Sequence, residues 1–200
     1  MFVHLAEKAW FLQCLSNQSL VSIFKNAKMV VTDVDGCLTP SSIHISQAGE
    51  EQKSFCVQDG FGITRALKQG LKIAFLSGRN DGITEHRAKR LGIAPEFCLT
   101  GYDAGKKAGL LELQQRNSIS KEEIIYFGDD VLDIEVKDLV GFFASPANSL
   151  FYISGNADLV MPRDGGKGSF RLLLDLVLYI QGKHPAQSWI EKTLQSWVKH

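Results

Sequence analysis

Short apolar runs rich in β-branched residues alternate with helical stretches along most of this chain. Repeated strand-then-helix order is typical of a parallel sheet whose strands are joined by crossover helices. Three of the runs are apolar at almost every position, as strands buried on both faces are. The predicted strands are Met29–Val34, Lys72–Leu76, Ile124–Phe127, Val140–Phe143 and Leu159–Met161, with Phe97–Leu99 as a weaker candidate.

Helix signals occupy the intervals between these runs. Ile63, Ala66 and Leu67 recur at helical spacing, and the pattern stops at Gly70, where a left-handed C-cap is easiest for glycine. A second pattern stops in the same way at Gly92. The predicted helices are Ile63–Gln69, Asp81–Leu91, Gly105–Gln115 and Ser169–Gln181.

The segment Ser42–Val57 interrupts this alternation and predicts a β-hairpin. The residues that alternate along its two arms are Ile43 and Ile45, then Lys53, Phe55 and Val57, with the turn at residues 47–50. We therefore expect an α/β fold, a Rossmann-like parallel sheet with helices on both faces and a hairpin inserted after the first strand. Residues 1–200 form a single domain in this prediction, with an N-terminal extension (1–27), a C-terminal tail (183–200) and no cap domain.

Charge and cysteine usage exclude several functions. The chain has 22 acidic and 22 basic residues, and no more than two Lys or Arg are adjacent, which disfavours nucleic acid or an anionic membrane as partner. The four cysteines form no CxxC pair, so we expect reduced thiols and no zinc site. The apolar stretches Leu5–Leu15 and Leu172–Ile180 are far shorter than the roughly 20 residues of a membrane span. A cytoplasmic location is expected.

Two aspartates, Asp33 and Asp35, directly follow the first predicted strand. Gly36 permits the chain to leave extended geometry, so that both carboxylates reach one site. In open α/β sheets ligands bind at the carboxyl ends of the strands. Paired carboxylates are favourable around a cation, and Mg²⁺ prefers hard oxygen ligands. The alternative is an Asx-turn that only ends the strand.

Two further strand ends carry polar groups. Ser77–Arg79 precede a helix whose N–H groups, with the Ser hydroxyl, would form a phosphate cradle, although a simple turn explains the same residues. Asp129, Asp130 and Asp133 follow the run Ile124–Phe127. Acids at a helix N-terminus suit the helix dipole without any metal, but this explains Asp129, at the strand tip, less well.

The pair Lys106 and Lys107 stands at a predicted helix start, where the dipole disfavours cations unless an anion compensates. Solvated lysines are the simpler alternative. Neither an HExxH motif nor a serine nucleophile elbow occurs. Together, the acids, the hydroxyl and the lysine describe a site for metal-assisted phosphoryl transfer through an aspartyl phosphate.

In type and order these motifs resemble the haloacid dehalogenase superfamily of phosphatases. The resemblance implies that Asp33 is the nucleophile and Asp35 the general acid and base. The groups it assigns to Mg²⁺ are Asp33, Asp129 and the Asp35 backbone carbonyl. The groups it assigns to phosphate are Ser77, Gly78 and Lys106, with Lys107 or a local bulge left open as alternatives to Lys106.

A narrower resemblance covers about residues 28–182. The segments similar to 3-deoxy-D-manno-octulosonate 8-phosphate phosphatases are Asp33–Thr39, Gly49–Glu51, Phe55–Ile63, Ser77–Arg79 and Gly165–Arg171. This resemblance implies an acidic sugar phosphate as substrate, within lipopolysaccharide precursor synthesis. It also implies a homotetramer in which the 42–57 hairpins cover neighbouring active sites, since a site without a cap domain must exclude water by other means.

Arg79 and Arg171 are the candidates for the substrate carboxylate, because a guanidinium pairs with a carboxylate bidentately. Structural ion pairs are the alternative for both. Asp59 and Gly60, from the shared segment Phe55–Ile63, are also expected on the substrate side. Departures from the family pattern also lie on this side, at Pro40-Ser41 and at Leu172.

Two other functions remain open at this point. A nonulosonate 9-phosphate phosphatase of the sialic acid type would keep the chemistry and change the sugar. A non-catalytic module that serves oligomerisation would need no proton donor, so Asp35 argues against it. The tail from Ala186, with Trp189, Ile190 and Trp197 at helical spacing, either docks onto neighbouring subunits or covers the core.

Overall fold

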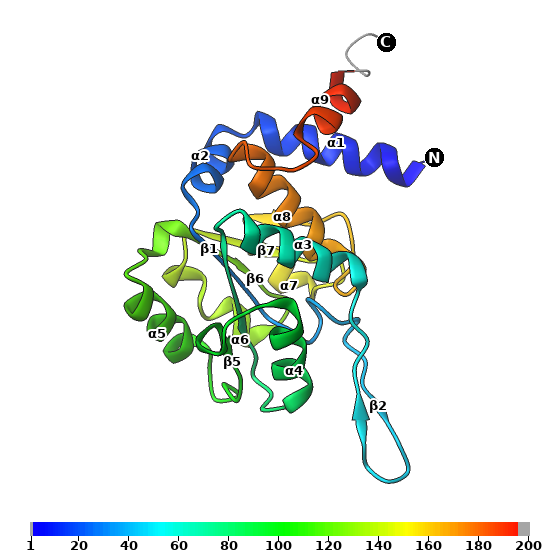
Figure 1. Ribbon diagram of the computed structural model, residues 1–200, viewed down its shortest axis with the longest axis vertical. Helices are drawn as coiled ribbons and strands as arrows, with labels where there is room; N and C mark the ends of the chain where they lie inside the picture. Colours follow the sequence, from blue (N-terminus) through cyan, green and yellow to red (C-terminus); the bar gives the residue numbers. More distant parts are fainter. Residues whose placement is uncertain (1, 196–200) are drawn as a thin grey trace.

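The computed structural model describes the backbone of residues 2–195 and the side chains of residues 5–195. Its centre is a six-stranded sheet of parallel strands in the order β5-β4-β1-β6-β7-β8 (Figure 1). The strands are β1 Met29–Thr32, β4 Lys72–Leu76, β5 Cys98–Leu99, β6 Ile124–Phe127, β7 Phe142–Ser145 and β8 Leu159–Val160. The predicted parallel α/β sheet is confirmed.

Two strand boundaries differ clearly from the prediction. Strand β1 ends at Thr32 rather than Val34, because two main-chain N–H groups of the following turn donate to the Val34 carbonyl. Strand β7 begins at Phe142 rather than Val140, because Val140 still closes the 3-10 helix η3 (Lys137–Leu139).

Alternate residues of the central strands pack on opposite faces of the sheet. Val30 belongs to a large apolar cluster and Val31 to a second one. The helices over the first cluster are α1 Phe2–Ser16, α2 Gln18–Asn26, α3 Val57–Lys68, α4 Gly82–Leu91 and α8 Ser169–Ile180. Those over the second are α5 Lys107–Asn117 and α7 Phe151–Ser154. Helices therefore cover both faces, as predicted. The remaining short helices are η1 Pro95–Phe97, η2 Lys121–Glu123 and α6 Val131–Ile134.

Helix α3 begins at Val57, six residues before the predicted start at Ile63. Gly60 and Gly62 lie in its first turns, and glycine weakens the helix signal of a sequence. The structure needs Gly62 for packing, because a Cβ there would lie 2.7 Å from the Arg171 Cδ of α8. The missed part of α3 is therefore held by tertiary contact rather than by helix propensity.

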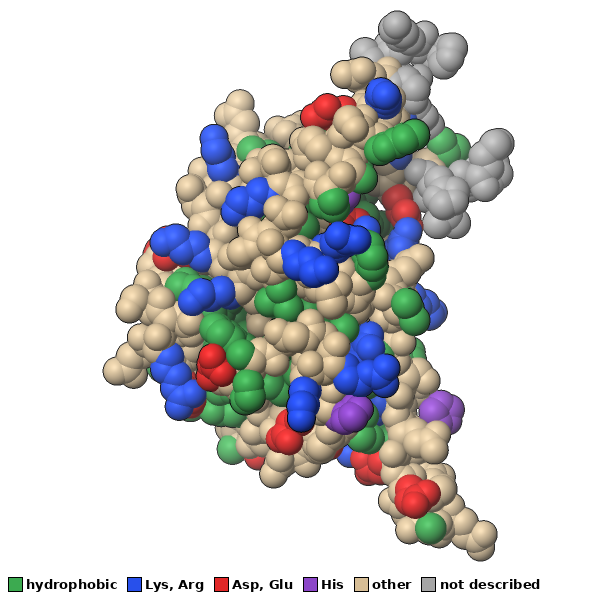
Figure 2. Space-filling view, viewed as in Figure 1, with side chains coloured by type: hydrophobic (Ala, Val, Ile, Leu, Met, Phe, Trp, Pro, Cys, Tyr) green, Lys and Arg blue, Asp and Glu red, His purple; other side chains and the backbone are tan. Residues whose placement is uncertain are grey.

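The predicted hairpin is present but shorter than expected. Strands β2 (His44–Ile45) and β3 (Glu51–Gln52) form a separate antiparallel pair, closed by a hydrogen bond from Ser46 N to Glu50 O of 2.9 Å. The second arm ends at Gln52 and not at Val57, which starts α3. The hairpin stands clear of the body (Figures 1 and 2), and Ile45 is 68% exposed.

Helices near the two ends of the described residues, α1 and α2 at one end and α9 (Gln187–Gln195) at the other, help to cover the core. Phe11 of α1 and Phe24 of α2 are buried in the larger cluster. Helix α9 lies beside α1 (Figure 1), where Ile190 packs against that cluster and Trp189 is 72% exposed. The tail therefore covers the core in part. Trp197 lies outside the described residues.

The rest of the chain adds no further layer. From β1 to β4 it forms only the hairpin and α3, and from β4 to β6 only helices and strands of the sheet itself, so the described residues contain no cap domain. The four cysteines are free thiols, as predicted. No helix within residues 2–195 is long and apolar enough to span a membrane.

Candidate active site

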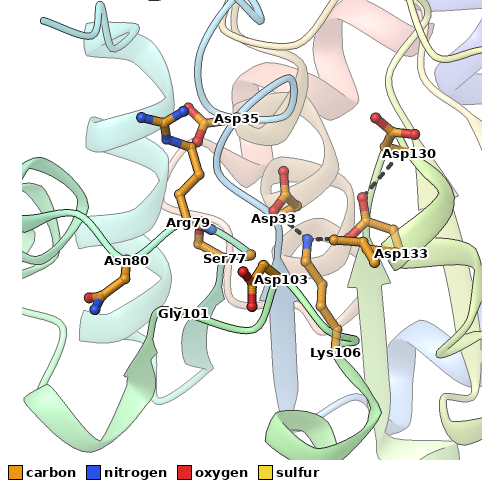
Figure 3. A pocket seen from close by; sticks show the side chains of 12 residues that line it. Asp33, Asp35, Ser77, Arg79, Asn80, Gly101, Asp103, Lys106, Asp130 and Asp133 are labelled. Carbon is orange, nitrogen blue, oxygen red and sulfur yellow. Dashed lines mark hydrogen bonds and ion pairs between the residues drawn. The ribbon is translucent and has the colours of Figure 1, made fainter. Parts of the chain in front are cut away.

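A cavity of about 690 Å³ opens at the carboxyl ends of the central strands (Figure 3). The parallel register sets Thr32 beside both Phe75 and Phe127, so the residues that follow these three strands emerge next to one another. The residues that line the cavity are Asp33, Asp35, Ser77, Gly78, Arg79, Asn80, Gly101, Asp103, Lys106, Asp130, Leu132 and Asp133. Most of the predicted site residues therefore meet in one place.

Asp33 lies at the floor of the cavity. Its N–H donates to the Phe127 carbonyl at 2.9 Å, which ties the start of the loop to β6, and its side chain is 9% exposed. Gly36 has a φ of +101°, and a Cβ there would overlap the Asp129 carboxylate. The bend expected at Gly36 is therefore present, and it brings the loop after β1 against the tip of β6.

Lys106 places its ammonium between two buried carboxylates. Its Nζ donates to Asp33 Oδ1 and, at 2.6 Å, to Asp133 Oδ1 (Figure 3), whereas Lys107 is exposed. Burial lowers the pKa of Lys106, but the two carboxylates outweigh it and raise the pKa above its ordinary value. These anions compensate a lysine at the N-cap of α5, where the dipole alone would disfavour it.

Asp133 is completely buried and organises the tip of β6. Besides Lys106, its carboxylate accepts hydrogen bonds from Tyr126 Oη at 2.7 Å, Asp129 N at 3.0 Å and Asp130 N at 3.1 Å. Asp130 caps α6 through a bond from Val131 N. Both acids thus lie at the start of α6, as the helix-dipole alternative expected. The sequence did not indicate that Asp133 also holds the lysine.

Three potential metal ligands lie close together beside the cavity. One oxygen each of Asp33 and Asp129 and the Cys37 Sγ lie within 4.8 Å of one another. Burial raises the pKa of Asp129 to about 8, with further increases from Asp33 and Asp133. Burial also raises the pKa of Asp33, although Lys106 opposes this. A buried and a half-buried carboxylate that disfavour each other's charge fit a hard divalent cation such as Mg²⁺.

Cys37 was not predicted at this site. Its Sγ donates to Asp129 Oδ1 at 3.5 Å and to the Phe127 carbonyl at 3.6 Å, and its side chain is fully buried. The only signal in the sequence was its position two residues after Asp35. Gly165 and Gly166 press on the same loop: Gly166 N donates to Cys37 O at 2.9 Å, and a Cβ on Gly165 would overlap the Gly36 carbonyl oxygen.

Asp35 lies at the edge of the cavity with its carboxylate held from one side. Lys53 Nζ donates to Asp35 Oδ2 at 2.8 Å and to Asp81 Oδ2 at 2.7 Å. Lys53 follows β3 of the hairpin and was not predicted at the site. The available signal was that Lys53 alternates with Phe55 on the second arm of the predicted hairpin.

The loop after β4 carries the residues from which a phosphate cradle was predicted. Ser77 is buried, and its Oγ accepts from Arg79 N at 3.2 Å. Helix α4 begins soon after, at Gly82. The Arg79 side chain is 43% exposed and forms an ion pair of 2.5 Å with Glu51 of β3. Arg79 therefore lines the cavity while it also joins the hairpin to the body.

Asp59, Gly60 and Arg171 do not line the cavity. The Asp59 carboxylate accepts from Gly168 N at 3.3 Å and Arg171 N at 2.7 Å, which caps the start of α8. The Arg171 Nε donates to both oxygens of Asp175 at 2.7 Å. A Cβ on Gly60 would lie 2.5 Å from an Arg87 nitrogen. Within the chain these three residues pack helices together, so the structure does not bring them to the substrate side as expected.

No protein-family model matches the chain. Among curated proteins, the chain is 34% identical to the 3-deoxy-D-manno-octulosonate 8-phosphate phosphatase KdsC of Haemophilus influenzae over 175 residues, which is 88% of this chain and 93% of the relative. It is also 34% identical to the KdsC of Escherichia coli K12 over 159 residues, 80% of this chain and 83% of the relative.

Solved structures agree with these relatives. The phosphatase of the same name from Moraxella catarrhalis, in complex with magnesium, phosphate and a KDO molecule, is 29% identical with a TM-score of 0.80, over 90% of this chain and 99% of that one. The cobalt-bound H. influenzae phosphatase is 34% identical with a TM-score of 0.77, over 82% and 94%. A hydrolase of haloacid dehalogenase superfamily subfamily III A from Legionella pneumophila is 28% identical with a TM-score of 0.82, over 91% and 98%.

The identity extends over most of both chains, and Asp33, Ser77 and Lys106 line one cavity. The similarity therefore goes beyond a shared fold. The predicted resemblance is confirmed, and this chain belongs to the 3-deoxy-D-manno-octulosonate 8-phosphate phosphatase family of the haloacid dehalogenase superfamily.

Proposed function

We propose that this chain is a Mg²⁺-dependent phosphatase that hydrolyses 3-deoxy-D-manno-octulosonate 8-phosphate to the free sugar acid and inorganic phosphate. The observation that carries the proposal is the meeting of Asp33, Asp35, Ser77 and Lys106 in one cavity, with Asp129 beside it. The relatives that match most of the chain are phosphatases of this sugar phosphate. A nonulosonate phosphatase or a non-catalytic module is not better supported.

Asp33 is the nucleophile in this proposal. One carboxylate oxygen attacks phosphorus, the bond to the sugar oxygen breaks, and an aspartyl phosphate forms on Asp33. Asp35 gives its proton to the departing sugar oxygen and then takes a proton from the water that attacks the aspartyl phosphate. Phosphate and the Asp33 carboxylate are released, and Asp35 has its proton back for the next cycle.

The remaining groups of the site bind the phosphoryl group and the metal ion in this proposal. Lys106, the Ser77 hydroxyl and the Gly78 N–H face the position of the transferred phosphoryl group, where positioning and electrostatics supply most of the rate. Asp33, Asp129 and the Asp35 backbone carbonyl would hold Mg²⁺. When bound, the ion neutralises the charge of the two carboxylates and of the phosphoryl oxygens.

The substrate carboxylate pairs with Arg79 in this proposal. Within the chain, Arg79 forms an ion pair with Glu51 of the hairpin, and both side chains are more than a third exposed. An exposed pair is weak, so the substrate carboxylate can replace Glu51 as the partner of Arg79. The 42–57 hairpin joins four copies of the chain and covers neighbouring sites, which is supported by its projection from the body and by the exposed Ile45. The cytoplasmic location stays a prediction.

Phosphate release tests the chemistry. Wild-type chain should release phosphate from 3-deoxy-D-manno-octulosonate 8-phosphate faster than from a nonulosonate 9-phosphate, and EDTA should stop the reaction. Asp33→Asn should lower turnover by at least about a thousandfold, because the nucleophile is removed. Asp138→Asn, at an exposed position outside the cavity, is the matched control. Wild-type turnover in Asp33→Asn would reject the mechanism, and preference for the nine-carbon sugar would reject the substrate.

Molecular mass in solution tests the assembly. Ile45→Glu should give particles smaller than the wild-type tetramer in light scattering after gel filtration, because it buries a charge in the hairpin contact. Leu111→Glu on α5, where the residue is 49% exposed, is the control and should leave the mass unchanged. A wild-type monomer, or a tetramer that survives Ile45→Glu, would contradict this part of the proposal.

A further inference from the structure

Lys53 is a buried lysine at the edge of the cavity that the mechanism above does not use. Its side chain has no exposed surface, although its backbone is partly exposed. Its ammonium lies between Asp35 Oδ2 at 2.8 Å and Asp81 Oδ2 at 2.7 Å. A buried charge is tolerated where it is paired, and here both partners are carboxylates that are 25% and 12% exposed.

Asp81 is itself fixed to the body of the protein. It is the N-cap of α4, and its Oδ1 accepts from Thr84 N at 2.8 Å. Burial acts to raise the pKa of Asp81, but the bonds from Lys53 and Thr84 outweigh it and lower the pKa below its usual value. Asp81 is therefore an anionic anchor, and it holds the lysine in one place as a hydrogen-bonded outer group orients a ligand in a metal site.

The two oxygens of Asp35 differ as a result. Oδ2 is occupied by Lys53, whereas Oδ1 is buried and has no hydrogen-bond partner among the described residues. A buried oxygen without a partner is unfavourable, and a ligand that bonds to it removes that penalty. Because Oδ2 is held by Lys53, Oδ1 is the oxygen of Asp35 that is left without a partner, and Asp35 itself lines the cavity.

We propose that Lys53 is a positioning residue for the proton transfers of Asp35. It holds Oδ2 so that Oδ1 carries the proton to the departing sugar oxygen and receives one from water in the second step. This inference rests on the proposed function, and it adds that the hairpin supplies a group on which the chemistry depends. Loss of such orientation typically costs 10–100-fold in activity.

A purely structural role, in which Lys53 only ties the hairpin to α4, makes a different prediction. If that role is correct, substitution of Lys53 should lower the turnover of every substrate by the same factor. A positioning role affects the first step only where the leaving group needs a proton. A sugar alkoxide needs one, whereas p-nitrophenolate leaves without one. Comparison of the two leaving groups in the first turnover therefore separates the roles, because attack of water on the aspartyl phosphate is not yet included.

The experiment uses Lys53→Met, which keeps the stem without the charge, Lys53→Arg as the conservative variant, and Lys68→Met at an exposed lysine of α3 as control. First-turnover release of alcohol is measured by rapid quench with excess full-length enzyme and Mg²⁺. The alkyl substrate is the sugar phosphate that wild type hydrolyses fastest. Thermal unfolding and molecular mass are measured for each variant.

Lys53→Met should slow alcohol release from the sugar phosphate about 10–100-fold and slow p-nitrophenol release less than about threefold. Lys53→Arg should restore most of the rate, and Lys68→Met should change neither. Asp81→Asn, which keeps an oxygen for the helix cap but loosens the lysine, should show the same pattern more weakly.

Four results would overturn the inference. In Lys53→Met, an equal loss of rate on both substrates, or no loss on either, would reject the positioning role. The proposed function would still stand in that case, because wild type is active. A Lys53→Met chain that unfolds, together with an Asp81→Asn chain that folds but shows no difference between leaving groups, would assign Lys53 a structural role. A wild-type chain inactive on every phosphate ester would instead reject the proposed function, and the inference with it.

Discussion

Asp133→Ala is expected to destabilise the chain more than the loss of any other acid of the site, although Asp133 is not assigned to the chemistry. The side chain has no exposed surface and accepts from Lys106 Nζ at 2.6 Å, from Tyr126 Oη at 2.7 Å and from two main-chain N–H groups. Alanine would leave the ammonium with Asp33 alone, and it would leave the buried Tyr126 hydroxyl and two partly buried N–H groups without this acceptor. Removal of one partner of a buried ion pair costs about 3–5 kcal/mol.

Each 1 kcal/mol shifts the midpoint of thermal unfolding by about 2–4 °C in a chain of this size, so Tm should fall by about 6–20 °C. Circular dichroism would measure Tm, and urea unfolding would test whether the midpoint falls with an unchanged m-value. Protein and Mg²⁺ concentrations must be equal in all samples, because assembly and ligands shift Tm. Asp130→Ala removes only the exposed cap of α6 and should cost about 0.5–2 kcal/mol. A loss below about 1 kcal/mol in Asp133→Ala would refute the reasoning.

Three further predictions concern metal, packing and substrate. The folded-state pKa of Asp129, about 8, and that of Asp33 lie above the unfolded value of 3.8. The stabilisation that these two carboxyl groups give the metal-free chain is therefore complete below about pH 4 and is lost as the pH rises through 8. Mg²⁺ should thus raise Tm more at pH 8 than at pH 5, and an equal gain would contradict this. Gly165→Ala should cost about 1–3 kcal/mol and lower kcat, because its Cβ would displace the Gly36 carbonyl; unchanged kcat and Tm would count against it. Asp59→Ala should lower Tm and leave KM unchanged, and a raised KM would return Asp59 to the substrate side.

The sequence by itself determined the sheet and the chemistry of its edge. The runs at residues 72–76 and 124–127 are strands with the predicted bounds, because strands buried on both faces are apolar throughout. Asp33 and Ser77 could be expected at one edge, since parallel strands end together and bring the residues that follow them together. For the lysine the sequence left Lys107 open, and the structure buries Lys106 in the cavity and leaves Lys107 exposed. The start of α3 was missed, because Gly60 and Gly62 are there for packing and weaken the helix signal.

Only the tertiary structure decided which charged side chains meet. Arg171 and Lys53 look alike in a sequence, as cations near family motifs, yet Arg171 pairs with Asp175 of its own helix and Lys53 reaches Asp35 across the cavity edge. The physical reason is that a strand or helix period is local and fixes only the face a residue occupies. The partner of a long cation depends on how separate elements pack, and in this chain the segment between β3 and α3 sets Lys53 beside Asp35.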